Sequence, residues 1–366
     1  ITGKGRCNLC NACDPEDFFS HVEKNEKFMY GPYYGFDSDA VMHFFEECGL
    51  DIKIERGNRV FPLSDKSVDI VDALYNFIKK NNVDFKQSKV IDVDKKDNRF
   101  IVKCLDDSIY SSEFLLICTG GLSYPATGST GDGYNFAKKF GHNVLKQSPS
   151  IVPIELKEDF CQSLMGLSLK NVTLSVFEDK KKIYSDIGEM MFTHFGISGP
   201  LVLTASSYLG DDLSKNSLEI DFKPGLTNEM LDKRLLRDFN EMSNKSISNV
   251  LIKLLPRSII KYVLIMAHIP QNKIINEITK EERNSLIRAV KGFKLTPKSL
   301  RPVTEAVVTR GGVDTKEINP KTMESKLVEN LFFAGEVIDV DAVTGGFNLQ
   351  IAFSTGISAS KGIIEK

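Results

Sequence analysis

The sequence predicts an α/β protein in which a parallel-sheet domain is interrupted by a β-rich segment and a helical segment. Three observations support this class. Residues 114–118 (FLLIC) form a continuous apolar run that ends in Thr119-Gly120-Gly121, as in a strand buried on both faces of a parallel sheet. Short alternating strands begin after residue 148, and helical periodicity dominates residues 228–292. Strand and glycine-rich loop character returns from residue 296.

Composition restricts the class of protein further. The chain has 366 residues, of which 42% are hydrophobic and 26% charged, so it can fill ordinary globular cores. Its net charge of −2 provides no overall basic field, and we therefore expect no nucleic-acid partner. The apolar runs are shorter than the roughly 20 residues of a membrane-spanning helix, and no signal peptide is evident. The sequence predicts a cytoplasmic protein without a membrane partner and with reduced cysteines.

The first half of the chain contains two amphipathic helices and a hairpin. Residues 37–48 place apolar side chains at helical spacing and end at Gly49, which suits a left-handed C-cap. Ser67 is the expected N-cap of a second helix that ends near residues 79–82. Residues 89–93 and 100–104 alternate like the strands of a hairpin.

The second half indicates a change of domain. Residues 169–177 and 218–222 alternate like antiparallel strands. Residues 228–255 carry leucines at helical spacing before Pro256, which indicates a small helical subdomain. The chain then returns to an apolar strand at residues 331–334 and ends in a helix from about residue 347 to residue 361.

Two glycine-rich turns are candidate ligand sites. Thr119-Gly120-Gly121 follows one buried strand, and Gly345-Gly346 opens the last helix after Gly335, Glu336 and Asp339. Free N–H groups at a helix start favour an anion, and the carboxylates can accept bonds from sugar hydroxyls. The alternative is that Gly345-Gly346 is only a tight turn and Asp339 a helix cap. The dinucleotide phosphate fingerprint G-x-G-x-x-G is absent. P-loop, H-E-x-x-H and G-x-S-x-G motifs are absent as well, which disfavours hydrolases.

Three cysteines stand at C-x2-C-x2-C spacing: Cys7, Cys10 and Cys13. This spacing resembles the start of a ferredoxin cluster run, but no fourth cysteine follows, and His21 is only a distant fourth ligand for zinc. We expect no metal site. A metal module is the alternative, and it predicts stoichiometric iron or zinc.

Four stretches together resemble one family: GKGRCN (residues 3–8), LLICTGGLSYPATGSTGDGY (115–134), MMFTHFGISGP (190–200) and the segment 311–356. The chain is similar over nearly its whole length to the BaiN-like flavoproteins, also described as NAD(FAD)-utilizing or aminoacetone-oxidase-like enzymes. This resemblance implies a Rossmann-type FAD-binding domain at residues 1–148 and 297–366. It also implies an inserted β-barrel-like domain at 149–227 and a helical subdomain at 228–296. The family's opening βαβ unit has no counterpart, so we expect an N-terminally truncated chain.

The resemblance also implies the FAD contacts. Gly3, Gly5, Arg6 and Asn8 would line the pyrophosphate, and Val90 the adenine side through its backbone. Thr119, Gly120 and Gly121 would pass close to the dinucleotide, while Gly335, Glu336 and Asp339 would hold the ribityl and phosphate region. The isoalloxazine ring would meet the following residues: Gly345, Gly346, Phe347, Asn348 and Leu349.

The function that follows is FAD-mediated hydride transfer, with NAD(P)H reducing a small enone-like or steroid-like substrate. The alternatives are an FAD-dependent amine oxidase and a truncated, non-catalytic fragment that cannot hold FAD. No catalytic acid or base is defined by the sequence; His194 and Tyr124 are the polar side chains to substitute first. Substrate identity and oligomeric state do not follow from the residues.

Overall fold

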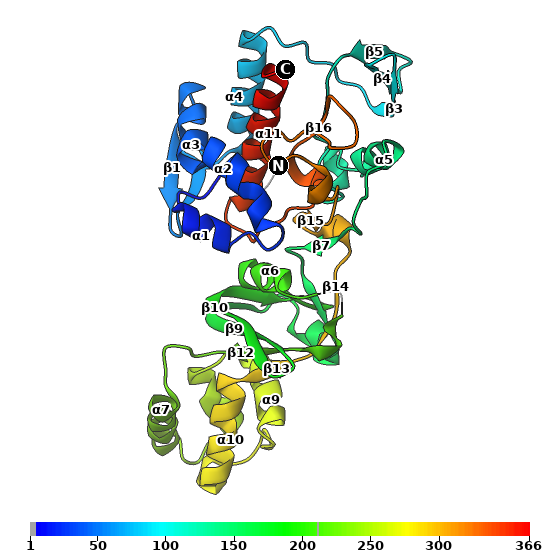
Figure 1. Ribbon diagram of the computed structural model, residues 1–366. Coiled ribbons are helices and arrows are strands. Elements are labelled where there is room, and N and C mark those ends of the chain that lie inside the picture. Colours follow the sequence, from blue (N-terminus) through cyan, green and yellow to red (C-terminus); the bar gives the residue numbers. More distant parts are fainter. Residues whose placement is uncertain (1–4, 211) are drawn as a thin grey trace. The chain divides into compact units, whose positions relative to one another are not determined.

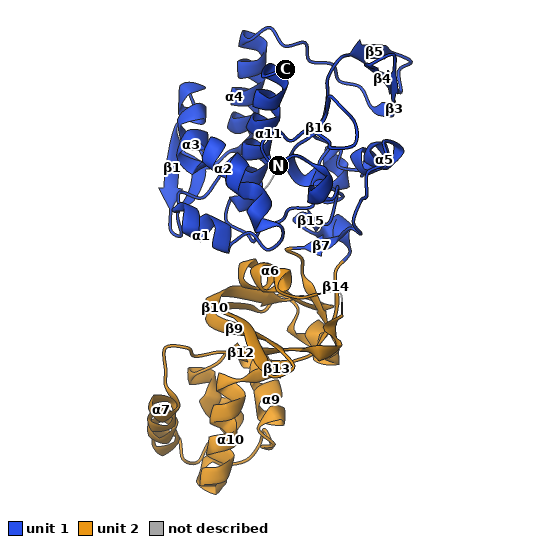
Figure 2. Ribbon diagram, viewed as in Figure 1, with its two compact units in different colours: residues 1–150, 302–366 blue, residues 151–301 orange. Residues whose placement is uncertain are grey.

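The computed structural model describes residues 5–210 and 212–366. The chain divides into two units (Figure 2). Unit 1 comprises residues 1–150 and 302–366, and unit 2 comprises residues 151–301. Apart from residues 149 and 150, the predicted β-rich and helical segments (149–227 and 228–296) lie in unit 2, while unit 1 is assembled from the two ends of the chain.

The N-terminal part of unit 1 is mainly helical (Figure 1). Asp14 and Asp37 cap α1 and α3 by accepting hydrogen bonds from the backbone N–H of Asp17 and Ala40. The predicted cap at Ser67 is wrong by one position: Lys66 is extended and precedes the helix, and Ser67 is its first residue. The elements of this part are α1 Pro15–Ser20, η2 Glu26–Met29, α2 Tyr30–Gly35, α3 Ser38–Glu47, β1 Ile52–Glu55, β2 Arg59–Pro62 and α4 Ser67–Lys80.

A parallel strand pair lies at the centre of unit 1. Strand β6 (Leu115–Ile117) pairs with β16 (Leu331–Phe333), and Leu331 lies opposite Leu115. All three residues of β16 are fully buried, as expected for a strand covered on both faces. This pair and the surrounding helices confirm the predicted mixed α/β class.

The remaining strands of unit 1 form small antiparallel sheets. The predicted hairpin is part of a three-stranded sheet of β3, β4 and β5, and β7 pairs with β15. The bounds are β3 Val90–Lys96, β4 Arg99–Cys104, β5 Ile109–Ser112, α5 Asp132–Lys139, β7 Ser148–Ser150 and β15 Val308–Arg310.

The last helix, α11 (Phe347–Ile364), lies beside α2 and buries mostly small or polar side chains. Gln350 Nε2 and Ser354 Oγ both donate hydrogen bonds to the carbonyl oxygen of Phe36, at 2.9 and 2.7 Å. Gly362 is required by close packing, because a Cβ there would come within 2.7 Å of the Thr322 backbone oxygen. The two hydrogen bonds to Phe36 join the C-terminal helix to the N-terminal third of the chain.

Within unit 2, the described residues form one seven-stranded antiparallel sheet in the order β13-β12-β9-β10-β11-β8-β14. Its two edge strands, β13 and β14, follow each other in the chain with only Thr296 between them. The sheet must therefore curl until its edges are close together. The bounds are β8 Ile154–Leu156, β9 Ser168–Glu178, β10 Lys181–Phe192, β11 Gly196–Ser198, β12 Asn216–Asp221, β13 Phe293–Leu295 and β14 Pro297–Leu300.

The helices of unit 2 share a hydrophobic core with this sheet. Leu231 of α7, Val263 of α9 and Leu286 of α10 belong to the same buried cluster as Leu174 of β9 and Leu218 of β12. The helices are α6 Pro200–Ser207, α7 Asn228–Glu241, α8 Ile247–Val250, α9 Arg257–Met266 and α10 Lys280–Lys291. Across the described parts of both units, the helices are too short or too polar to cross a lipid bilayer.

Candidate flavin site

The two parallel strands of unit 1 end at the same edge of their sheet, and each is followed by a glycine turn. Thr119-Gly120-Gly121 follows β6, and Gly335-Glu336 follows β16. A Cβ on Gly121 would lie 3.1 Å from the Glu336 carboxyl carbon, so the two turns are in contact. The fold thus brings together two groups of residues that the sequence assigned to one site, at the strand ends where open α/β sheets bind ligands.

Glu336 connects these turns to strand β15. One carboxylate oxygen accepts a hydrogen bond from the backbone N–H of Thr309 at 2.6 Å, and the backbone N–H of Gly121 also interacts with the carboxylate. Burial raises the pKa of Glu336 above its usual range. The two N–H donors lower this pKa, but their effect is smaller than that of burial. The side chain therefore holds the Thr119-Gly120-Gly121 turn in place.

Gly121 allows this arrangement because it lacks a side chain. A Cβ there would lie 2.4 Å from Thr309 Oγ1. That hydroxyl oxygen accepts hydrogen bonds from the backbone N–H groups of Leu122 and Ser123, at 2.8 and 3.1 Å. Position 121 must therefore be a glycine because Thr309 of the same chain packs against it, whether or not a ligand is bound.

Asp339 is the second predicted carboxylate and is 1% exposed. It forms an ion pair with Lys24 Nζ at 2.9 Å and accepts a hydrogen bond from Asn25 Nδ2 at 3.0 Å. Tyr134 of α5 is also buried, and the charges of Glu336 and Asp339 help to raise the pKa of its phenol after the larger effect of burial. The Tyr134 hydroxyl has no hydrogen-bond partner in the structure.

The Gly345-Gly346 turn packs against the opening loop of the chain. A Cβ on Gly346 would lie 2.4 Å from the Cys10 carbonyl oxygen, and the φ angle of +100° is itself unfavourable for other residues. Asn11 Nδ2 donates to the carbonyl oxygen of Gly345 at 3.0 Å. The turn is thus fixed by residues that precede it by more than 300 positions.

Helix α11 begins directly after this turn without a side-chain cap and without an acidic residue in its first turn. Asn348 does not cap it; its side chain donates to the Ala342 carbonyl at 2.7 Å and accepts from the Ala342 N–H at 3.0 Å. Leu349 packs instead against the core cluster that contains Cys10. The uncapped N–H groups at the start of α11 and the helix dipole favour negative charge at this point.

The predicted pyrophosphate residues of the opening loop are only partly in place. Gly3 lies outside the described residues. Gly5 faces open space, and the Asn8 side-chain oxygen is buried without a hydrogen-bond partner. Arg6 forms ion pairs with Glu55 and Asp65 and lies over the Phe61 ring, so its charge is already balanced within the protein. Val90 begins β3, in the separate three-stranded sheet.

The three cysteines of the opening loop are buried core residues. Burial raises the pKa of both Cys10 and Cys13 to about 12, which keeps them as thiols at neutral pH. Among residues 5–210 and 212–366, no three His, Cys, Asp or Glu side chains are arranged to hold a metal ion. His21 Nδ1 instead lies 2.7 Å from the Asp17 carbonyl oxygen.

The two candidates for a proton donor lie in different units. Tyr124, in unit 1, is 45% exposed and has a left-handed backbone. His194, in unit 2, is exposed in the turn between β10 and β11. The backbone N–H of Thr193 closes this turn by donating a hydrogen bond to the Gly196 carbonyl at 2.8 Å.

The sequence did not indicate His21, whose ring stacks on Phe347 with centroids 4.5 Å apart. No local pattern indicates a contact between residues so far apart in the chain.

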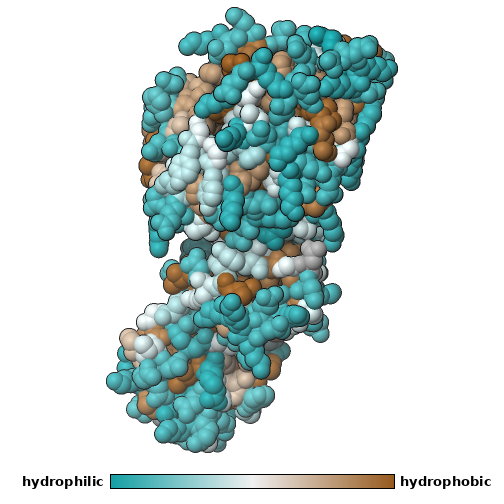
Figure 3. Space-filling model, viewed as in Figure 1, coloured by the Kyte–Doolittle hydropathy of each residue, from teal (hydrophilic) through white to brown (hydrophobic). Residues whose placement is uncertain are grey.

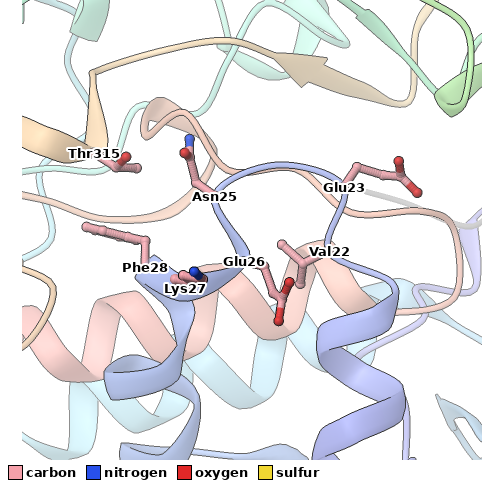
Figure 4. A pocket seen from close by; sticks show the side chains of 7 residues that line it. All are labelled: Val22, Glu23, Asn25, Glu26, Lys27, Phe28 and Thr315. Carbon is pink, nitrogen blue, oxygen red and sulfur yellow. The ribbon is translucent and has the colours of Figure 1, made fainter.

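Unit 1 has a surface hollow of about 460 Å³ (Figure 4). Its lining residues are Val22, Glu23, Asn25, Glu26, Lys27, Phe28 and Thr315. None of the predicted cofactor residues lines it, although Asn25 connects it to Asp339 through the hydrogen bond described above.

The residues present fit a dinucleotide cofactor. The buried oxygens of Asn8 and Tyr134 without partners, the uncapped start of α11, and the open faces of Gly5 and Gly335 offer the required polar groups and space. Gly335 has φ +75°, and a Cβ there would meet only Ala352, at 3.7 Å. Gly121 and Gly346, by contrast, are already required by packing within the chain.

The fold and the family match together define a protein with a Rossmann domain and a candidate dinucleotide site. The family model described as "HI0933-like protein Rossmann domain" matches residues 1–362, and the chain belongs to this family. Three curated relatives are similar over its length. A 3-dehydro-bile acid delta(4,6)-reductase of Clostridium scindens is 27% identical over 100% of this chain and 89% of its own. A protein of Escherichia coli named ribosomal RNA dihydrouridine synthase is 30% identical over 100% of this chain and 88% of its own length. A protein of the same name in Haemophilus influenzae is 34% identical over 99% of this chain and 88% of its own length.

Proposed function

We propose that this oxidoreductase reduces a carbon–carbon double bond conjugated to a carbonyl group, in an enone-like or steroid-like substrate, with NAD(P)H as the electron donor. The observation that carries the proposal is the uncapped start of α11 behind the rigid Gly345-Gly346 turn. The names of the relatives support it. A 3-dehydro steroid with unsaturated 4 and 6 positions is a conjugated ketone, and dihydrouridine is uridine whose ring double bond, conjugated to a carbonyl, has been saturated.

In this proposal FAD supplies the hydride-transfer chemistry when bound. Gly5, Arg6 and Asn8 would line the pyrophosphate, and Val90 would meet the adenine side. Thr119, Gly120 and Gly121 approach the dinucleotide. Gly335, Glu336 and Asp339 hold the ribityl region, and Gly345, Gly346, Phe347, Asn348 and Leu349 approach the ring.

The chain's own contribution at the ring is electrostatic. A reduced flavin carries negative charge on its pyrimidine edge, and the N-terminus of α11 stabilises such a charge by about 1 kcal/mol. Glu336 contributes by holding the Thr119-Gly120-Gly121 turn in one conformation. Reduction of the double bond also needs a proton at the carbon next to the carbonyl, for which His194 and Tyr124 are the candidate donors.

The test is a flavin spectrum followed by a turnover assay. The purified chain is incubated with FAD, desalted, and mixed anaerobically with NADH or NADPH and a 4-en-3-one steroid. We expect retained flavin, bleaching of its absorption by the nicotinamide, and recovery of the oxidised spectrum as the enone is consumed. Loss of all flavin on desalting would contradict the cofactor assignment. In a parallel assay in air, consumption of an amine such as aminoacetone with reduction of dioxygen to hydrogen peroxide, together with no enone reduction, would favour an amine oxidase instead.

A further inference from the structure

Tyr134 of α5 lies inside unit 1 with its hydroxyl group unsatisfied. The residue is 3% exposed, and its phenolic oxygen has no hydrogen-bond partner within residues 5–210 and 212–366. The visible surface of unit 1 is largely hydrophilic (Figure 3), and a tyrosine that needed only water could lie there, as Tyr34 does at 66% exposed. Because a buried hydroxyl without a partner is unfavourable, this position indicates a partner that the chain itself does not supply.

Two other tyrosines provide a comparison. Tyr33 of unit 1 is 1% exposed, and its hydroxyl forms a hydrogen bond with the Ser38 side chain. The hydroxyl of Tyr184, in unit 2, is buried without a partner in the part of the chain that the structure describes. Tyr184 therefore matches Tyr134 in this respect, but it belongs to a different unit.

The Tyr134 ring lies against the turn that precedes α5. The backbone N–H of Tyr134 donates a hydrogen bond to the Gly131 carbonyl at 3.1 Å. A Cβ on Gly131 would lie 3.4 Å from the Tyr134 ring and 2.7 Å from the Leu122 side chain. This packing limits the directions in which the hydroxyl can point.

Two carboxyl groups act on the Tyr134 hydroxyl. The charges of Glu336 and Asp339 raise the pKa of the phenol, after the larger effect of burial, so both groups lie within electrostatic range of it. Lys24 forms an ion pair with Asp339 at 2.9 Å, so its charge is already balanced. A phosphate group at this point would be repelled by the carboxylates.

A neutral hydroxyl group suits these surroundings better. Its oxygen can accept the phenolic hydrogen of Tyr134, while its own hydrogen is donated to a carboxylate oxygen. In Asp339, Oδ2 accepts a hydrogen bond from Asn25, whereas Oδ1 has its ion pair with Lys24 but no hydrogen bond among the described residues. One donor and a nearby acceptor match a chain of adjacent hydroxyl groups.

We propose that Tyr134 and Asp339 bind the ribityl hydroxyl groups of the flavin, with Tyr134 as the hydrogen-bond donor, and that no phosphate group of the cofactor lies at this point. This inference rests on the proposed function, because it needs a bound flavin. It adds Tyr134 to the site and separates the sugar-alcohol part of the cofactor from its phosphates.

The test compares the affinities of three full-length proteins for a series of flavins. Tyr134→Phe removes only the hydroxyl group, and Tyr184→Phe is the matched control, since it removes a buried hydroxyl that also has no described partner. Fluorescence titrations give the dissociation constants of lumiflavin, riboflavin, FMN and FAD. Lumiflavin has a methyl group in place of the ribityl chain, riboflavin has the ribityl chain without phosphate, and FMN and FAD add the phosphates.

We expect Tyr134→Phe to weaken the binding of riboflavin, FMN and FAD by the same factor of about three to ten, which corresponds to one hydrogen bond. Lumiflavin should bind equally to wild type and Tyr134→Phe. Tyr184→Phe should match wild type for every flavin. Without flavin, the urea midpoint of Tyr134→Phe should equal or exceed that of wild type, because the lost hydroxyl had no partner.

Several results would overturn the inference and leave the proposed function in place. A loss confined to FMN and FAD would mean that Tyr134 binds a phosphate, and an equal loss for lumiflavin would place the phenol at the ring. Unchanged riboflavin affinity would remove Tyr134 from the site. A lower urea midpoint of flavin-free Tyr134→Phe would mean that the protein or an ordered water already satisfies the hydroxyl.

Failure of the proposed function has a different signature. If wild type binds none of these flavins, the cofactor assignment is wrong, and the role of Tyr134 is overturned with it.

Discussion

The side-chain amide of Asn11 donates a hydrogen bond to the carbonyl oxygen of Gly345 at 3.0 Å, across 334 positions of sequence. The same nitrogen also lies 3.0 Å from the Gly57 carbonyl oxygen, and Asn11 is only 6% exposed. One buried amide thus fixes the glycine turn in front of α11.

Replacement of Asn11 by alanine should destabilise unit 1 by about 1 kcal/mol, because the carbonyl oxygens of Gly57 and Gly345 lose the donor that the buried amide supplies. It should also weaken FAD binding severalfold, since the turn would no longer be held. Urea denaturation and FAD fluorescence quenching measure the two effects. Replacement of the exposed Asn276 by alanine serves as the control. If Asn11→Ala is destabilised but binds FAD with unchanged affinity, the turn is not needed for cofactor binding.

The substitutions Gly346→Ala and Gly128→Ala distinguish backbone strain from steric clash. The two glycines have nearly equal φ angles, +100° and +102°, but only Gly346 has a backbone oxygen, that of Cys10, within 2.4 Å of the added Cβ. We expect Gly128→Ala to cost about 1 to 2 kcal/mol from strain alone. Gly346→Ala should cost at least about 2 kcal/mol more. Equal unfolding free energies would mean that the turn relaxes away from Cys10.

Burial raises the pKa of Glu336, so the folded protein binds this proton more tightly than the unfolded chain. Stability should therefore fall as pH rises from the ordinary glutamate pKa through the raised value. Glu336→Gln should lack this loss and gain stability relative to wild type between pH 5 and pH 8. The urea midpoints of both proteins at pH 5 and pH 8 test this prediction. If wild type becomes more stable relative to Glu336→Gln as the pH rises, the prediction is wrong.

His194 is tested as the proton donor by His194→Gln, with His268→Gln as an exposed histidine control in the same unit. We expect His194→Gln to slow enone reduction at least tenfold while reduction of the flavin by NADH proceeds at the wild-type rate. Stopped-flow spectra resolve the two half-reactions. If neither half-reaction changes, the proton comes from elsewhere, and Tyr124→Phe is the next variant to measure.

Local sequence patterns were sufficient for the elements that depend on local interactions. The helix capped by Asp37, the apolar strand of residues 115–117 and the helix that follows Gly346 could all be predicted, because capping, burial pattern and glycine conformation act within a few residues. The mixed α/β class and the family resemblance follow from these elements and their order.

The sequence could not show what each side chain would face. The partners of Arg6 are Glu55 and Asp65, the group that requires Gly121 to be a glycine is Thr309, and the ring that stacks on Phe347 belongs to His21. These contacts join segments that are far apart in the chain and leave no periodic pattern.

The same distinction applies to the charges. The sequence by itself determined that residues 222–301 carry a net charge of +9. Only the tertiary structure decided which acids are consumed in internal ion pairs, such as Asp232 with Arg283, and which cations remain in solvent. Ion pairing and burial depend on distances between elements that packing alone brings together.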